Sequence, residues 1–165
     1  KPKAPERTII EAAQSNYDSE KNQVSFEGDV LLTQPTLKLK CDKLLANMVA
    51  EARTSVIPQA SGISNAVASG DVYIQRIMPD GSEKLGISKR AEYESSSGLI
   101  ILSVYPKVKD GLQIIEGTSE STRIFITEAG EHRVEGPSTI KFVPKGGKAD
   151  GFSLPDQRAL LNLDN

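Results

Sequence analysis

Hydrophobic and polar residues alternate along residues 24–44, VSFEGDVLLTQPTLKLKCDKL, in the manner typical of β-strands. Within two runs, apolar side chains stand at every second position, at Val24, Phe26, Val30, Leu32, Leu37, Leu39 and Cys41. Successive strand side chains point to opposite faces, so this spacing indicates a sheet with one buried face. Gln34-Pro35 separates the runs, and proline favours a turn because it lacks a backbone donor. We therefore predict two antiparallel strands joined by a tight turn.

Further alternating segments, separated by polar turns, extend this pattern over most of the chain. We expect strands at 7–17, 70–77, 84–93, 99–108, 112–120, 121–128 and 133–143. Roughly nine to twelve short strands at this spacing predict an all-β domain.

Residues 44–69 are less regular than the rest and allow two interpretations. In the first, a strand runs to about Met48, a loop follows, and another strand begins at Ile63. In the second, residues 44–53 form a short helix, because Leu, Ala, Met and Glu favour that conformation.

The chain also repeats itself internally. Residues 16–40 resemble residues 92–115, with Tyr17 aligned to Tyr93. A shorter unit recurs as EGDVLL, SGDVYI and EGPSTIKF, and its glycines are Gly28, Gly70 and Gly136. A glycine between two strand segments allows a bend or a bulge.

Repeats of this size predict a stack of hairpin-like layers, because each layer is too small to bury its own apolar face. Such a sheet curls around its aliphatic side chains and leaves an open edge at each end. The predicted fold is an open, twisted, solenoid-like stack of antiparallel strands. We assign residues 1–6 to a flexible leader, 7–150 to the domain and 151–165 to a C-terminal tail.

The ordered series of motifs resembles the LptA/OstA-like family of periplasmic lipopolysaccharide transport proteins. Its first repeat is AAQSNYDSEKNQVSFEGDVLLTQPTLKLKCDKLLANM, and AVASGDVYI and KRAEYESSSGLIIL follow as further repeats. The chain departs from the family pattern at 49–62, which is long, and at Val104-Tyr105-Pro106, where a glycine before the proline is typical. The resemblance implies a V-shaped β-jelly-roll with an apolar groove that binds the acyl chains of lipid A.

The resemblance also implies partners and a compartment. The partners are lipopolysaccharide, other OstA-like domains of the transport machinery, including LptC-like and LptD-like ones, and further copies of the chain stacked head to tail. The compartment is the periplasm. The chain opens at KPKAPERT without an initiator Met, so we expect a form from which a signal or anchor has been removed.

The apolar positions of the alternating strands are the candidate lipid-binding residues, although each is equally compatible with the core. They are Val24, Phe26, Val30, Leu32, Leu37, Leu39, Val72, Ile74, Ile100, Leu102, Leu112, Ile114, Ile124, Ile126, Ile140 and Phe142. Basic residues on the alternate positions either meet lipid phosphates or form a solvated strand face; they are Lys38, Lys40, Lys43, Lys89 and Arg90.

Composition narrows the remaining classes. Twenty basic and 22 acidic residues leave a net charge of −2, which argues against nucleic-acid binding through a global positive field. The single cysteine, Cys41, excludes an intrachain disulfide and a Cys-rich zinc site, and its strand position predicts a buried thiol. His132 is the only histidine, and no hydrolase, metalloprotease or P-loop motif accompanies it, so we expect no catalysis, metal or cofactor.

Two non-enzymatic functions therefore remain open from the sequence. The first is lipid A binding and transport toward the outer membrane, either by a soluble bridge or by an anchored LptC-like component. The second is a structural or adaptor module that assembles edge to edge without lipid.

Overall fold

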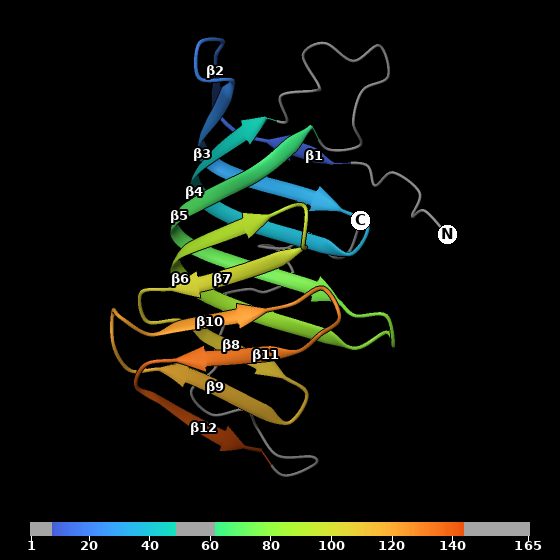
Figure 1. The fold of residues 1–165 in the computed structure, drawn as a ribbon, viewed down its shortest axis with the longest axis vertical. Helices are drawn as coiled ribbons and strands as arrows, with labels where there is room; N and C mark the ends of the chain where they lie inside the picture. The colour runs from blue at the N-terminus through green and yellow to red at the C-terminus, as the bar shows by residue number, and fades with distance from the viewer. Residues whose placement is uncertain (1–7, 49–61, 144–165) are drawn as a thin grey trace.

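The computed structural model describes residues 8–48 and 62–143, which form twelve strands of one antiparallel sheet (Figure 1). The strands are β1 (Ile9–Glu11), β2 (Gln14–Asp18), β3 (Gln23–Gln34), β4 (Leu37–Met48), β5 (Ile63–Ile77), β6 (Glu83–Glu94), β7 (Leu99–Ser103), β8 (Lys107–Asp110), β9 (Gln113–Gly117), β10 (Arg123–Ile126), β11 (His132–Glu135) and β12 (Ser138–Phe142). No helix occurs in these two ranges. The all-β prediction is confirmed.

The sheet folds over on itself into two wings. The long strands β3, β4, β5 and β6 each cross from one wing to the other, and their pairing shifts register midway. Beyond that shift β6 pairs with β8 through 84–87 and with β7 through 90–94. We call the half that contains β2, β7, β10 and β11 the β7 wing, and the half that contains β1, β8, β9 and β12 the β8 wing. In the described residues no pairing joins the first strands to the last, so the sheet is open.

Left-handed backbone residues make these bends. Gly28 and Gly70 have φ of 86° and 78°, and each is followed by an aspartate that is also left-handed. The register shifts of the β3–β4 and β5–β6 pairs span these two glycines, so the bulges predicted from the repeat are confirmed there. Gly136, with φ of 99°, separates β11 from β12.

A third bend lacks glycine altogether. Val104 and Tyr105 have φ of 63° and 55°, and they separate β7 from β8. A left-handed conformation costs a residue with a Cβ atom about 1–2 kcal/mol, and a β-branched residue is rarely found in it. This is the place where the family pattern has a glycine before the proline, so the structure gives that glycine a physical reason.

Three predicted strands are each divided in the structure. Residues 7–17 form β1 and β2, residues 99–108 are interrupted at the left-handed pair, and residues 133–143 are interrupted at Gly136-Pro137. Residues 44–48 belong to β4, so the helix interpretation is wrong there, and the strand from Ile63 is confirmed. The predicted leader and tail, and residues 49–53 of the helix alternative, lie outside the described residues.

The apolar core lies between the wings. Each wing contributes inward rows of side chains, one from every strand, because directly paired residues share a face of the sheet. One row runs through Leu32, Leu39 and Ile74, and a row of the other wing runs through Leu44, Ala68 and Ala91. All six side chains are buried.

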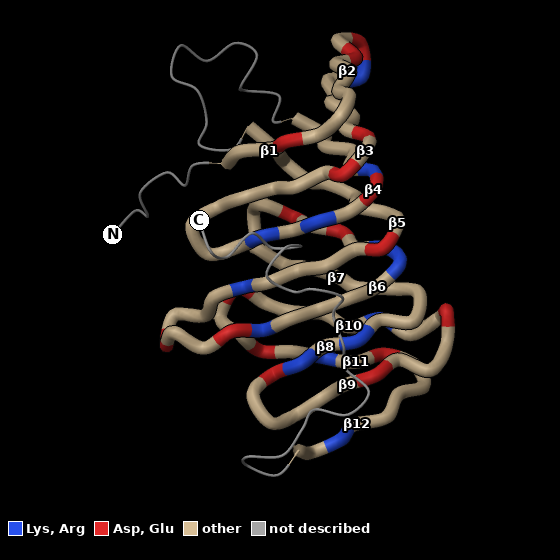
Figure 2. Tube along the Cα trace, turned by 180° about the vertical axis from the view of Figure 1, so that it is seen from behind, with Lys and Arg blue, Asp and Glu red and all other residues tan. Residues whose placement is uncertain are grey.

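The outer face carries charges of both signs. Figure 2 shows basic and acidic residues interspersed along the strands. Lys43 pairs with Glu27 at 3.7 Å and Lys89 with Asp71 at 2.9 Å, and all four side chains are more than half exposed. Pairs of this kind contribute little stability, because water competes for both partners.

Replacing Gly70 by alanine tests the bend. The new Cβ would adopt the left-handed conformation and would also meet the Asp42 side chain, so we expect unfolding free energy to fall by about 3 kcal/mol. Gly111→Ala is the matched control, because Gly111 is left-handed, with φ of 62°, but faces open space; we expect a loss of only about 1 kcal/mol. Urea unfolding of both variants measures the difference, and equal losses would show that the Asp42 contact is irrelevant.

Candidate functional site

An apolar cavity lies between the wings in the N-terminal half of the sheet. It is lined by Leu32, Gln34, Leu37, Leu39, Leu44, Ile63, Ala66, Ala68, Ile74, Ala91, Glu92, Tyr93 and Ile100. Its volume is only about 20 Å³, which is sufficient for about one water molecule. The wings are therefore in contact along most of the interior.

Short side chains create this space. Ala66, Ala68 and Ala91 lie on the inward face of the β7 wing, where Ala68 pairs directly with Ala91 across β5 and β6. Leu39 and Ile74, from the β8 wing, line the same cavity. Larger side chains at the three alanine positions would fill the space between the wings.

The cavity continues toward the end of the sheet where the chain starts. A second cavity, of about 210 Å³, is lined by Thr8, Ile10, Val24, Phe26, Ala46, Met48 and Ile63. Ile63 lines both cavities, so the two are adjacent. Apart from the Thr8 hydroxyl, every side chain around this mouth is apolar.

A third cavity, of about 520 Å³, opens along the seam where the free sides of the wings meet. Its lining includes Gln34, Thr36 and Arg76 from the β8 wing and Tyr93 and Glu128 from the β7 wing. Gln34 and Tyr93 also line the inner cavity, so apolar and polar surfaces adjoin at these two residues.

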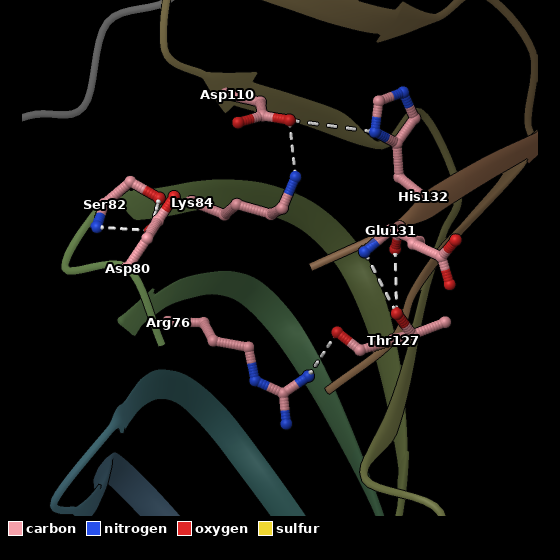
Figure 3. A network of polar contacts seen from close by, with 8 residues as sticks. All are labelled: Arg76, Asp80, Ser82, Lys84, Asp110, Thr127, Glu131 and His132. Carbon is pink, nitrogen blue, oxygen red and sulfur yellow. Dashed lines mark hydrogen bonds and ion pairs between the residues drawn. The ribbon is translucent and has the colours of Figure 1, made fainter. Parts of the chain in front are cut away.

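Polar contacts close the seam farther toward the C-terminal end (Figure 3). Lys84 on β6 forms an ion pair with Asp110 on β8, and Asp110 Oδ2 lies 3.7 Å from His132 Nδ1 on β11. Arg76 Nη1 donates to the Thr127 carbonyl oxygen at 3.4 Å. We call Arg76, Lys84, Asp110, Thr127 and His132 the polar clasp. Within the described ranges no buried side-chain nitrogen or oxygen lacks a hydrogen-bond partner.

The sequence-predicted residues fall into four groups. Leu32, Leu37, Leu39, Ile74 and Ile100 line the inner cavity, and Val24 and Phe26 line the mouth. Five others belong to the buried core cluster: Val30, Val72, Leu102, Ile124 and Ile126.

The remaining four predicted residues lie near the C-terminal end. Ile114 is buried, but it pairs with Lys109 and Lys141, on the face of β9 opposite the one that carries Ile115 into the core cluster. Leu112 is exposed before β9 begins, and Ile140 and Phe142 are exposed on β12.

The sequence prediction missed several residues that line the inner cavity: Leu44, Ile63, Ala66, Ala68, Ala91 and Tyr93. Their signal was the same period of two, continued through SNAVASGDV and KRAEY. The alanines escaped notice because a short side chain contributes little to an apolar pattern, although it is the short side chain that leaves room.

The predicted basic residues lie on the outer face. Lys38 and Lys40 alternate with inward Leu37 and Leu39 on β4. The hydrogen bond to Asp71, followed by the charge of that carboxylate, raises the pKa of Lys89.

Two searches for other kinds of site gave nothing within residues 8–48 and 62–143. No group of His, Cys, Asp or Glu side chains is arranged to hold a metal ion. No helix in these residues is long and apolar enough to span a membrane.

Comparisons with known proteins agree on one family. Residues 9–121 match the family described as LptA/(LptD N-terminal domain) LPS transport protein. The fold is similar to that of LptH from Pseudomonas aeruginosa, described as the LptA homologous periplasmic component of the conserved lipopolysaccharide transport device. That match has a TM-score of 0.66 and 15% sequence identity, and it covers 83% of this chain and 95% of LptH. No curated protein matches the chain significantly.

Cys41 offers a test of the closed interior. Its side chain is 2% exposed, and burial, followed by the negative charge of Asp42, raises its thiol pKa to about 12. Because the thiolate is the reactive form, we expect a thiol reagent at pH 8 to label the folded protein at least about 100-fold more slowly than the urea-unfolded chain. The labelling rate is followed by mass spectrometry. Equal rates would contradict the inward placement of Cys41.

Proposed function

Because the chain belongs to the LptA/LptD N-terminal domain family of LPS transport proteins, we propose that it carries lipopolysaccharide with the acyl chains held between its wings. The observation that supports this most directly is the apolar lining that continues from the mouth at Phe26 through Ile63 to the inner cavity. The family is one of transporters, which agrees with the expectation that the chain is not an enzyme.

Transfer of acyl chains from water supplies the binding energy. Each methylene removed from water contributes about 0.8 kcal/mol, so several chains together need no specific polar contact. The cavity of about 20 Å³ is too small for an acyl chain, so the wings must separate when lipid enters. The cost of separation is low in the N-terminal half, because contacts between apolar side chains are exchanged for contacts with apolar lipid.

The polar part of the lipid would remain at the seam. Gln34 and Thr36 on one wing and Tyr93 on the other line the seam cavity next to the apolar interior. This arrangement suits an amphiphile whose tails lie inside and whose sugar and phosphate groups face water. By analogy with the periplasmic LptH, we place the chain in the periplasm, with the lipopolysaccharide transport machinery as its partner.

A structural module without lipid is the second candidate, and the open edges of the sheet are what favour it. β1 pairs only with β3, and β12 pairs only with β9. Each edge therefore presents backbone groups to another chain. Pairing of the first edge of one copy with the last edge of another is heterologous, so it extends into a filament and aligns the interiors. This assembly also serves the lipid-carrying function.

Ala66→Leu separates lipid binding from folding. The added methyl groups fill the inner cavity, so we expect lipopolysaccharide binding to fall at least about tenfold, with a stability loss of about 1–3 kcal/mol from overpacking. Val67→Leu is the control, since Val67 is the next residue of β5 and faces outward. Native mass spectrometry of protein from a Gram-negative host measures bound lipid. An unmodified protein without lipid would favour the structural module.

Phe142→Lys tests assembly. Phe142 is 74% exposed on the last edge strand, and a lysine there opposes pairing with another strand. We expect sedimentation velocity to show concentration-dependent oligomers for the unmodified chain and fewer for the variant. Leu112→Lys, which changes an exposed leucine outside any strand, serves as the control. A strict monomer for the unmodified chain at high concentration would contradict head-to-tail assembly.

A further inference from the structure

We propose that the polar clasp is a gate that divides the interior between the wings, so that lipid occupies the N-terminal half while the clasp is closed and reaches the β12 end only when it opens. This inference rests on the proposed lipid-carrying function. It concerns the side chains in Figure 3, where Lys84 and His132 both point toward Asp110 from different strands.

The clasp joins parts of the sheet that share no backbone pairing. Asp110 lies on β8, which pairs with β6 and β9, whereas His132 lies on β11, which pairs with β10. Arg76 lies in the β8-wing half of β5, and Thr127 directly follows β10 in the other wing. The contacts Asp110–His132 and Arg76–Thr127 therefore cross the seam and hold the wings together by side chains.

The clasp faces the interior. Along the inward face of the β8 wing, Arg76 pairs with Lys84, and Lys84 pairs with Asp110. One position farther inward, the corresponding row is Ile74, Gly86 and Val108, which is apolar. Lys84 is only 4% exposed, and Arg76 is 7% exposed, so both cations are held almost entirely away from water.

Burial makes the clasp a barrier to hydrocarbon. An acyl chain that slid between the wings at this level would separate Asp110 from His132 and expose Lys84 to the lipid tail. A buried charge without compensating partners is strongly unfavourable, and hydrocarbon offers no hydrogen bonds in exchange. The leucine and alanine rows nearer the mouth impose no such cost.

The interior beyond the clasp is filled while the gate is closed. Leu102, Val108, Ile115 and Ile124 are all fully buried there. Gly130, in the turn between β10 and β11, approaches Met78 and Lys84 of the opposite wing, so this turn lies directly over the gate. Opening the clasp therefore means moving the β10–β11 hairpin away from the β5–β6 hairpin.

Photo-crosslinking to purified lipopolysaccharide tests the gate in the full chain. A benzophenone amino acid replaces Phe26 at the mouth, Ile140 on the inward face of β12, or Lys141 on the outward face of the same strand as background. With the clasp intact, we expect the Phe26 probe to crosslink roughly tenfold more than the Ile140 probe, which stays at the Lys141 background, because lipid does not displace a buried ion pair.

Asp110→Ala and His132→Ala open the gate in two ways. The first removes the carboxylate that both partners share, and the second removes only the contact across the seam and leaves Lys84 paired. We expect either variant to raise Ile140 crosslinking several-fold above the Lys141 background without lowering crosslinking at Phe26. Glu116→Gln is the control, since it breaks a β8–β9 ion pair, Lys107–Glu116 at 3.3 Å, on the outer face.

The outcomes separate the gate from the function on which it rests. Equal crosslinking at Phe26 and Ile140 in the unmodified protein would overturn the gate and leave lipid carrying intact. No rise at Ile140 in His132→Ala, the milder variant, would also overturn it, provided that urea unfolding shows a folded protein; a poorly folded Asp110→Ala is set aside for this reason. Absence of crosslinking even at Phe26 would overturn lipid carrying and the gate together.

Discussion

The architecture depends on one constraint: a single sheet, with no helix in its described residues to cover it, must bury its own apolar face. It does so because each long strand bends partway and continues into a second wing that lies against the first. The bends need left-handed residues, and Gly28 and Gly70 adopt that conformation without steric cost. At the third level Val104 and Tyr105 adopt it at a cost, and there the strand is divided into two.

Two wings joined at their bends and meeting at a seam have an interior whose chemistry is set by the contacts between them. In the N-terminal half those contacts are between apolar side chains, which a lipid tail replaces at little cost. In the C-terminal half they include Asp110 with His132 and Arg76 with Thr127, which a lipid tail cannot replace. The same fold therefore offers a compliant region and a fastened one, and the difference lies in a few side chains rather than in the backbone.

Much of this could be read from the sequence, because strand alternation and the position of glycine are local signals. The turn at Pro35, the bulges at Gly28 and Gly70 and the strand from Ile63 all followed from them. The break at Val104-Tyr105 did not, since neither residue type favours a left-handed conformation. Nor did the buried position of Lys84: its partner Asp110 comes from a strand that only the tertiary pairing brings alongside.

The candidate site shows the same limit. Period two indicates that Leu39 and Ile74 share a face, but it does not indicate which side chain of the opposite wing they meet. The importance of Ala66 and Ala91 arises only when two rows face each other, because an alanine is informative for what it leaves empty. Ile114 and Ile115 are both buried and both aliphatic, so alternation alone could not decide which one belongs to the core cluster.

The order in which strands pair has a consequence for how the chain folds. β3, β4, β5 and β6 are neighbours both in sequence and in the sheet, so each can add to its predecessor as a simple hairpin as soon as it is available. Beyond β6 the pattern changes: β7 waits for β10, and β9 waits for β12. Pairings between distant segments form more slowly, because a longer loop must close first. The N-terminal layers are thus able to serve as a template during synthesis, and the C-terminal end of the sheet is the last part to acquire its structure.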